Sequence, residues 1–193
     1  MLRSNQLDAD RALVLVIDMQ EKLLPRIGCA ERVIAAGEKL LRGTKIFELP
    51  VLATEQHPEG IGPTHGAIRS CIDANGGRTI QKKTFSAWAQ AEVREALLEL
   101  DRPQVVLIGI EAHICVQQTA LDLVSRDYDV FVCADAVGSR GGLDYRRSLD
   151  RMVQEGAWVT TVESVLFELC NAWDAPQFKP MIEVIKAIPP SDL

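Results

Sequence analysis

Short apolar runs rich in β-branched residues alternate with stretches of helical periodicity along almost the whole chain. The runs that we predict as strands are 12–17, 50–54, 78–81, 104–110, 129–133 and 158–162. Helical spacing is found in 31–49, 89–100, 115–126 and 145–154, and the segment 174–193 is predicted as a helix followed by a tail. Alternation of this kind builds a parallel sheet with helices on both faces. The sequence therefore predicts a single three-layer α/β/α domain over residues 1–193, with a mainly parallel sheet of six strands.

The composition of the chain argues against some classes of binding partner. The 193 residues carry a net charge of −6 and no long basic run, which argues against nucleic acid or an anionic membrane as the main partner. No apolar run reaches the roughly 20 residues that span a bilayer, and the first residues lack the apolar core of a signal peptide. We therefore expect a cytoplasmic protein acting on a small molecule, with an organellar location as the alternative.

The cysteines also indicate a reducing compartment. They are scattered, odd in number and include no Cys-x-x-Cys pair; their positions are Cys29, Cys71, Cys115, Cys133 and Cys170. This pattern fits reduced thiols better than a disulfide framework or a zinc site. We expect four of the five to be structural.

Cys115 stands where a buried parallel strand should end and a helix should begin. The strand is 104–110, and helical spacing resumes at Val116. A thiol in the first turn of a helix faces the positive end of the helix dipole, which favours the reactive thiolate. Open α/β sheets also bind their ligands at this edge. The sequence thus predicts a nucleophile at Cys115; the alternative is a small buried apolar residue.

Asp18 ends the predicted strand 12–17 and should lie at the same edge of the sheet as Cys115. Its carboxylate could accept the proton of the thiol or of an attacking water. The alternative is an N-cap for a helix that begins at Met19, since aspartate is a favoured cap.

Lys82 and Lys83 follow the predicted strand 78–81. A lysine beside a carboxylate and a thiol would stabilise the thiolate and orient the acid. The alternative is that both are solvated loop residues, as most lysines are. His113, two residues before Cys115, could also tune the thiol.

The segment 55–77 is rich in Gly and Pro, and a loop of this length is usually functional or locally structured. It contains Glu55, His57 and His65, which could form a metal site, although the spacing of the histidines matches no strong template. The glycine-rich stretch 138–142 lacks the P-loop and dinucleotide patterns. We therefore predict neither a metal nor a nucleotide cofactor.

Four segments, taken in order, resemble the isochorismatase-like cysteine hydrolase superfamily. They are Val16-Ile-Asp-Met-Gln20, Lys82-Lys-Thr-Phe-Ser-Ala-Trp88, Gly109-Ile-Glu-Ala-His-Ile-Cys-Val116 and Ala134-Asp-Ala-Val-Gly-Ser-Arg140. The resemblance covers about 12–169 and implies a Rossmann-like, isochorismatase-like hydrolase fold. It also implies a triad of Asp18, Lys82 and Cys115. The lysine is Lys82 by register, because it precedes the aromatic Phe85 by three positions, and Lys83 is the fallback.

The resemblance further implies a cis peptide bond between Ile110 and Glu111, which would aim the N–H of Glu111, with that of Cys115, at an oxyanion. The substrate contacts that it implies are Gln20, Gln56, His57, Phe85 and Trp88. Nicotinamidases in this family bind a metal through Asp-x-His and a further His, whereas the stretch here begins with Glu55-Gln-His and resembles a branch without the metal. Members of the family are homo-oligomers, from dimers to octamers.

The implied activity is hydrolysis of a small amide, imide or carbamoyl compound through a thioester on Cys115. An isochorismate-like vinyl ether is the alternative substrate, and its cleavage does not need the cysteine. Two functions without catalysis are further alternatives. One is an α/β scaffold that retains the site by descent, and the other is a redox sensor that acts through Cys115.

Overall fold

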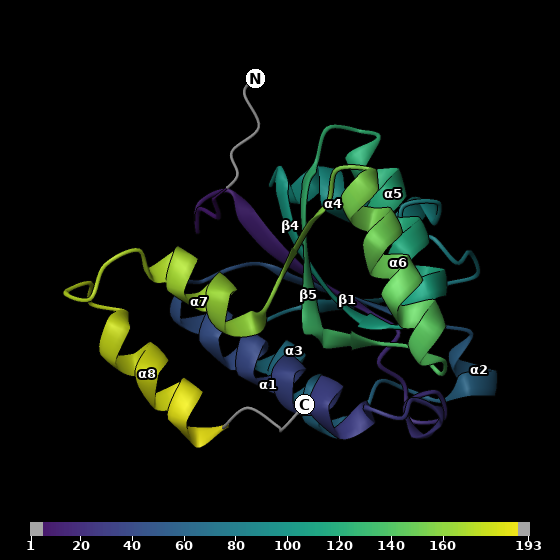
Figure 1. The fold of residues 1–193 in the computed structure, drawn as a ribbon, viewed down its shortest axis with the longest axis horizontal. Helices are drawn as coiled ribbons and strands as arrows, with labels where there is room; N and C mark the ends of the chain where they lie inside the picture. Colours follow the sequence, from purple (N-terminus) through teal and green to yellow (C-terminus); the bar gives the residue numbers. More distant parts are fainter. Residues whose placement is uncertain (1–5, 189–193) are drawn as a thin grey trace.

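The computed structural model describes residues 6–188, which form a single six-stranded sheet between two layers of helices (Figure 1). The strands are β1 (Ala12–Ile17), β2 (Val51–Gln56), β3 (Arg78–Lys82), β4 (Gln104–Ile110), β5 (Asp129–Gly138) and β6 (Trp158–Thr160). Their order in the sheet is β3-β2-β1-β4-β5-β6, and all five neighbouring pairs are parallel. The predicted fold class is therefore confirmed.

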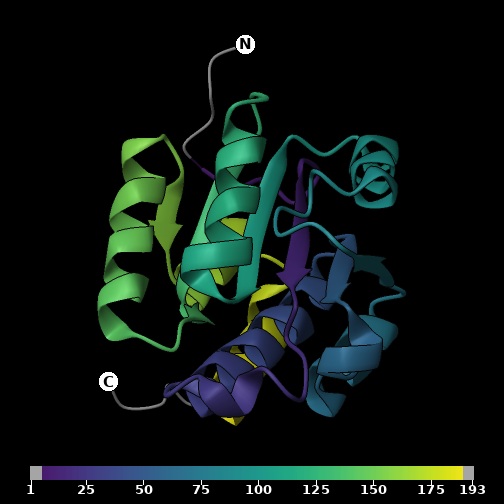
Figure 2. The same cartoon turned by 90° about the vertical axis from the view of Figure 1, so that its right-hand side faces the viewer.

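Helices cover both faces of the sheet (Figures 1 and 2). One layer contains α1 (Ala30–Ile46), α3 (Gly66–Ala74), α7 (Val162–Cys170) and α8 (Phe178–Ala187). The other contains α4 (Ala91–Leu100), α5 (Gln117–Val124) and α6 (Gly142–Gln154). Within residues 6–188 no helix combines the length and the apolar character that a membrane crossing requires.

The central strand β1 shows how the sequence builds this core. All six of its residues are buried, and side chains on a strand alternate between the two faces. Leu13, Leu15 and Ile17 pack with α4 and α5. Val14 and Val16 pack with α1 and α3. A continuous apolar run is thus what a strand covered on both faces requires.

Several segments have other bounds or more structure than the sequence predicted. The expected strand 129–133 continues to Gly138 as β5. The expected loop 55–77 contains the short helix α2 (Pro58–Ile61) and also α3, whose buried Ile68 and Ile72 have helical spacing. The expected strand 158–162 ends at Thr160, and Thr161 caps α7 by accepting the N–H of Ser164 at 3.4 Å. The predicted C-terminal helix is present as α8, while the tail 189–193 lies outside the described residues.

Strand β4 approaches β1 very closely just before the end of both strands. Gly109 has a φ of +124°, and a Cβ added there would lie 2.0 Å from the carbonyl oxygen of Ile17. The pairing of β4 with β5 also shifts register between Leu107 and Gly109. Because only glycine fits this approach, it fixes where the residues that follow β1 and β4 lie relative to each other.

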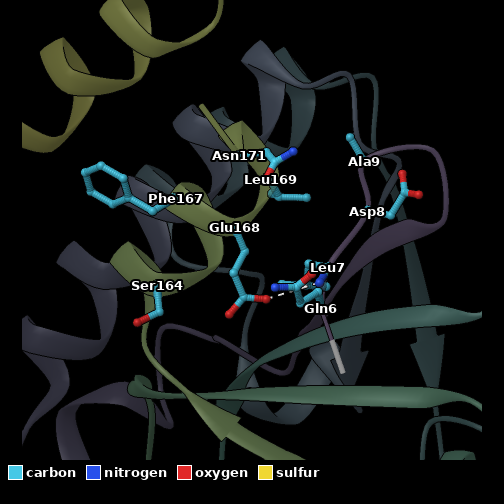
Figure 3. A pocket seen from close by; sticks show the side chains of 9 residues that line it. All are labelled: Gln6, Leu7, Asp8, Ala9, Ser164, Phe167, Glu168, Leu169 and Asn171. Carbon is cyan, nitrogen blue, oxygen red and sulfur yellow. Dashed lines mark hydrogen bonds between the residues drawn. The ribbon is translucent and has the colours of Figure 1, made fainter. Parts of the chain in front are cut away.

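A cavity of about 730 Å³ lies at the opposite, amino end of β1, between the segment that precedes this strand and α7 (Figure 3). It is lined by Gln6, Leu7, Asp8, Ala9, Ser164, Phe167, Glu168, Leu169 and Asn171. The N–H of Leu7 donates to the carboxylate of Glu168 at 3.1 Å across it. This cavity contains none of the predicted site residues.

Candidate active site

Three polar side chains from different strands meet at the carboxyl edge of the sheet. Asp18 follows β1, Lys82 ends β3, and Cys115 follows β4. Nζ of Lys82 lies 2.7 Å from Oδ2 of Asp18 and 3.6 Å from Sγ of Cys115. The side chains of Asp18 and Lys82 are completely buried, and Cys115 is 7% exposed. The structure thus brings together the three residues that the resemblance assigned to a triad.

Asp18 has a left-handed backbone, with a φ of 48°, which is uncommon for residues other than glycine. Thr54 on β2 holds it twice: the N–H of Asp18 donates to the carbonyl of Thr54 at 3.2 Å, and the Thr54 hydroxyl donates to Oδ1 at 2.8 Å. The alternative role as an N-cap is wrong, because no helix begins at Met19 and the next helical turn starts at Leu24.

Lys82 is held by uncharged groups as well as by the carboxylate. Its ammonium donates to Oε1 of Gln56 at 2.7 Å and to the carbonyl oxygens of Thr84 and Phe85 at 3.0 and 3.2 Å. A buried charge is tolerated when it is paired and hydrogen-bonded in this way. Lys83 is exposed, so the register argument for Lys82 agrees with the geometry.

Cys115 lies in the π-helical turn η2 (Ala112–Val116), which leads directly into α5. Burial, followed by the negative charge of Asp18, raises the pKa of Cys115 to about 12, against the opposing effect of Lys82. This direction opposes the expectation that the helix terminus favours the thiolate. A thiol with a raised pKa reacts with the help of a base that takes its proton as the sulfur attacks.

Gln20, predicted to contact substrate, is fully buried and its amide is occupied by backbone groups. Its Oε1 accepts the N–H of Gln56 at 2.8 Å, and its Nε2 donates to the carbonyls of Gln56 and Gly62 at 3.0 and 2.6 Å. Gln56 in turn contacts Lys82. The two glutamines therefore form a chain of hydrogen bonds that ends at the lysine, and the amide of Gln20 is used within the protein.

His57 and Phe85 contact Lys82 through their backbones, whereas the side chains of these two residues and of Trp88 have other surroundings. Trp88 packs edge-on against Tyr128, with ring centroids 5.8 Å apart, and beneath Arg126. His57 is exposed, and its nearest charged partner is Glu59 at 3.5 Å. The side chain of Phe85 is 56% exposed, although its carbonyl contacts Lys82. The ring of Trp88 thus packs on Tyr128 and Arg126, and the backbone of Phe85 borders the site.

Glu55, the carboxylate considered for a metal site, has other partners. It accepts the N–H and the hydroxyl of Thr64 at 2.7 and 2.8 Å, and Arg69 at 2.6 Å. Burial alone would raise the pKa of Glu55, but these hydrogen bonds and the charge of Arg69 hold it below its ordinary value. Among residues 6–188 no three His, Cys, Asp or Glu side chains are grouped as a metal site would need.

Sequence reasoning missed a set of contacts next to the nucleophile. Glu111, which follows the cis peptide bond from Ile110, accepts the backbone N–H and Nε of Arg140 at 3.2 and 3.0 Å. The N–H and Nδ1 of His113 lie 3.3 and 3.0 Å from the hydroxyl of Ser139. The available signal was the segment ending in Ser139 and Arg140, which matched the superfamily pattern without a role.

Comparison with known proteins gives consistent matches. A family model of the isochorismatase domain matches residues 12–164. The isochorismatase domain-containing protein 1 of Salmo salar is 40% identical over 174 residues, which make up 90% of this chain. The chain spans 60% of the length of that relative.

Two solved structures share the fold over almost the whole chain. The MAR1 ribonuclease of Caenorhabditis elegans has a TM-score of 0.88 and 31% identity, with 97% of this chain and 100% of that chain covered. The YcaC gene product of Escherichia coli, an octameric hydrolase of unknown specificity, has a TM-score of 0.82 and 25% identity, with 97% and 91% covered.

Proposed function

Because the chain belongs to the isochorismatase family of hydrolases, we propose that it cleaves a C–N bond of a small amide, imide or carbamoyl compound through a thioester on Cys115. The observation that carries this proposal is the position of Lys82, whose ammonium contacts both the carboxylate of Asp18 and the sulfur of Cys115 in a buried site. A base, a nucleophile and a fixed positive charge are the parts that acyl transfer to a thiol requires.

In the first half-reaction, Asp18 accepts the thiol proton while the sulfur of Cys115 attacks the carbonyl carbon and a C–S bond forms. The backbone N–H groups of Glu111 and Cys115 are the proposed donors to the oxyanion. Protonated Asp18 then gives its proton to the leaving nitrogen, and the C–N bond breaks. The products of this half-reaction are a thioester and ammonia or an amine.

In the second half-reaction, Asp18 removes a proton from water, whose oxygen attacks the thioester carbonyl. The C–S bond breaks, the acid leaves, and the sulfur recovers the proton from Asp18. The ammonium of Lys82, which contacts both the carboxylate and the sulfur, stabilises negative charge on either group as the proton moves between them. A neutral resting thiol suits this scheme, because Asp18 must be free to act as base in both halves.

The proposal extends to the state of the protein in the cell. The octameric E. coli relative supports a homo-oligomer. The five free cysteines favour a reducing compartment, for which we propose the cytoplasm. The net charge of −6 supports a small-molecule substrate over RNA, although the C. elegans relative carries the name of a ribonuclease.

A panel of small primary amides, imides and carbamoyl compounds tests the proposal, with release of ammonia or amine as the readout. Cys115→Ala should abolish release, whereas the matched Cys29→Ala should behave like the parent protein. Release that survives in Cys115→Ala would refute the thioester. Cleavage of isochorismate that does not require Cys115 would point to a vinyl ether substrate instead. Cleavage of RNA would point to a ribonuclease.

A further inference from the structure

We propose that Arg140 holds the carboxylate of Glu111 and thereby positions the backbone N–H of Glu111 as an oxyanion donor. Arg140, which lies outside the triad, would then affect the rate of acyl transfer. The inference rests on the function proposed above, because it takes the N–H of Glu111 as one of the donors. Arg140 is a positioning residue here: it acts through Glu111, without touching the reacting atoms.

The geometry consists of two pairs of neighbouring residues that face each other. Glu111 and His113 lie on the segment that joins β4 to the nucleophile, and Ser139 and Arg140 follow β5. Each residue of the first pair makes two polar contacts with one residue of the second, all between 3.0 and 3.3 Å. We call these four residues the brace. The end of β5 is thereby joined at two points to the segment that carries the proposed donors.

The contact of Glu111 with Arg140 is the stronger of the two because both side chains are charged. Glu111 is 9% exposed, and a single oxygen, Oε2, accepts both N–H groups of Arg140. The peptide N–H of Glu111 and its carboxylate belong to one residue, so the peptide cannot reorient freely while the carboxylate is held. Errors of about 1 Å in such a donor can cost about 100-fold in rate.

Two other roles for Arg140 make different predictions. Its side chain is 53% exposed, so the outer end of the guanidinium could bind a substrate directly. Its loss would then weaken substrate binding and leave the transfer step intact. A purely structural role would lower the stability of the fold and slow every reaction of Cys115 together.

Two electrophiles that react with the sulfur of Cys115 separate these roles. The sulfur attacks the carbonyl of p-nitrophenyl acetate, forms a C–S bond and expels p-nitrophenolate through an intermediate that carries an oxyanion, while the thiol proton goes to Asp18. Iodoacetamide alkylates the same sulfur: the C–S bond forms as the C–I bond breaks and iodide leaves, the thiol proton is lost, and no oxyanion forms. The ratio of the two rates at Cys115 therefore reports on the oxyanion donors alone.

Arg140→Ala and Glu111→Gln should each slow acylation of Cys115 by about 10- to 100-fold and leave alkylation within about 2-fold of the parent. The double variant should be no slower than the slower single variant, because both changes act on the same charged contact between Glu111 and the side chain of Arg140. Arg140→Lys retains the charge and should recover part of the rate. The matched control is Arg147→Ala, which removes an exposed arginine that pairs with Asp150 on α6.

The proposed role of the brace would be overturned if Arg140→Ala and Glu111→Gln lowered the acylation and alkylation rates equally. An unchanged acylation rate in these variants would also overturn it. If Cys115 of the parent protein is not acylated at all, the proposed function fails instead, and hydrogen exchange of the peptide 110–117 then decides the inference. Exchange that is faster in Arg140→Ala than in Arg147→Ala would support the brace. Equal exchange in the two variants would refute it.

Discussion

The ammonium of Lys82 lies 2.7 Å from the carboxylate of Asp18, and neither side chain is exposed to solvent. Two opposite charges buried at this distance depend on each other, because an isolated charge in a protein interior is very costly. The pair therefore stabilises the folded site and also takes part in the proposed reaction. Removing either residue should affect both the stability of the protein and the reaction at Cys115.

Lys82→Met should lower the free energy of unfolding by about 3–5 kcal/mol, because it leaves the buried carboxylate of Asp18 without its partner. Urea denaturation provides the measurement. Lys83→Met, the matched change at the exposed neighbour, should stay within about 0.5 kcal/mol of the parent. Equal effects of the two substitutions would contradict the assignment of Lys82 to the site.

Asp18→Asn should increase the rate at which iodoacetamide alkylates Cys115 at a given pH. Burial is the main cause of the raised pKa of Cys115, and the charge of Asp18 is the next; Lys82 opposes both. Removing the carboxylate leaves the ammonium to stabilise the thiolate, so the pKa falls and alkylation becomes several-fold faster. Alkylation followed against pH by peptide mass spectrometry measures this, and an unchanged rate would show that Asp18 does not act on the thiol.

The raised pKa of Cys115 also predicts how stability depends on pH. The value is about 12 in the folded protein and 9.0 for an ordinary thiol, so the folded state holds the proton more tightly. The contribution to stability is complete below pH 9 and is lost as the pH rises from 9 to 12, by up to about 4 kcal/mol. Urea unfolding across this range should show a steeper loss in the parent than in Cys115→Ala, and parallel curves would contradict the pKa.

Gly109→Ala should destabilise the protein by more than about 3 kcal/mol. The new Cβ would lie 2.0 Å from the carbonyl oxygen of Ile17, and the positive φ adds strain. Gly28→Ala is the control, since a Cβ there meets nothing within 4 Å. Thermal unfolding compares the two, and similar midpoints would mean that β1 and β4 do not approach as closely as described.

The sequence predicted the strands of this fold well because a strand buried on both faces leaves a continuous apolar run. The bounds of 12–17 and 104–110 agree with β1 and β4. Short helices between such runs were harder to predict. The segment 55–77 has helical spacing only over α3, and the prolines and glycines around it conceal that period.

The candidate site was predictable as a set of residues but not as an electrostatic environment. Position at strand ends, together with the resemblance, selected Asp18, Lys82 and Cys115. The raised pKa of Cys115 depends on burial and on the nearby carboxylate, and neither can be read from spacing along the chain. The contact between Glu111 and Arg140 joins residues 29 positions apart and was likewise out of reach.

The most direct test of the central claim uses Asp18→Asn and p-nitrophenyl acetate, with the products followed as released p-nitrophenolate and as acetyl groups on peptides. Removal of the carboxylate lowers the pKa of Cys115, so the variant should still be acylated through its thiolate, but it lacks the base that activates water. It should therefore release about one equivalent of p-nitrophenolate, retain the acetyl group as a thioester on Cys115 and then stop, whereas the parent should continue to turn over. Continued turnover by the variant at the parental rate, or an acetyl group found on any residue other than Cys115, would contradict the account.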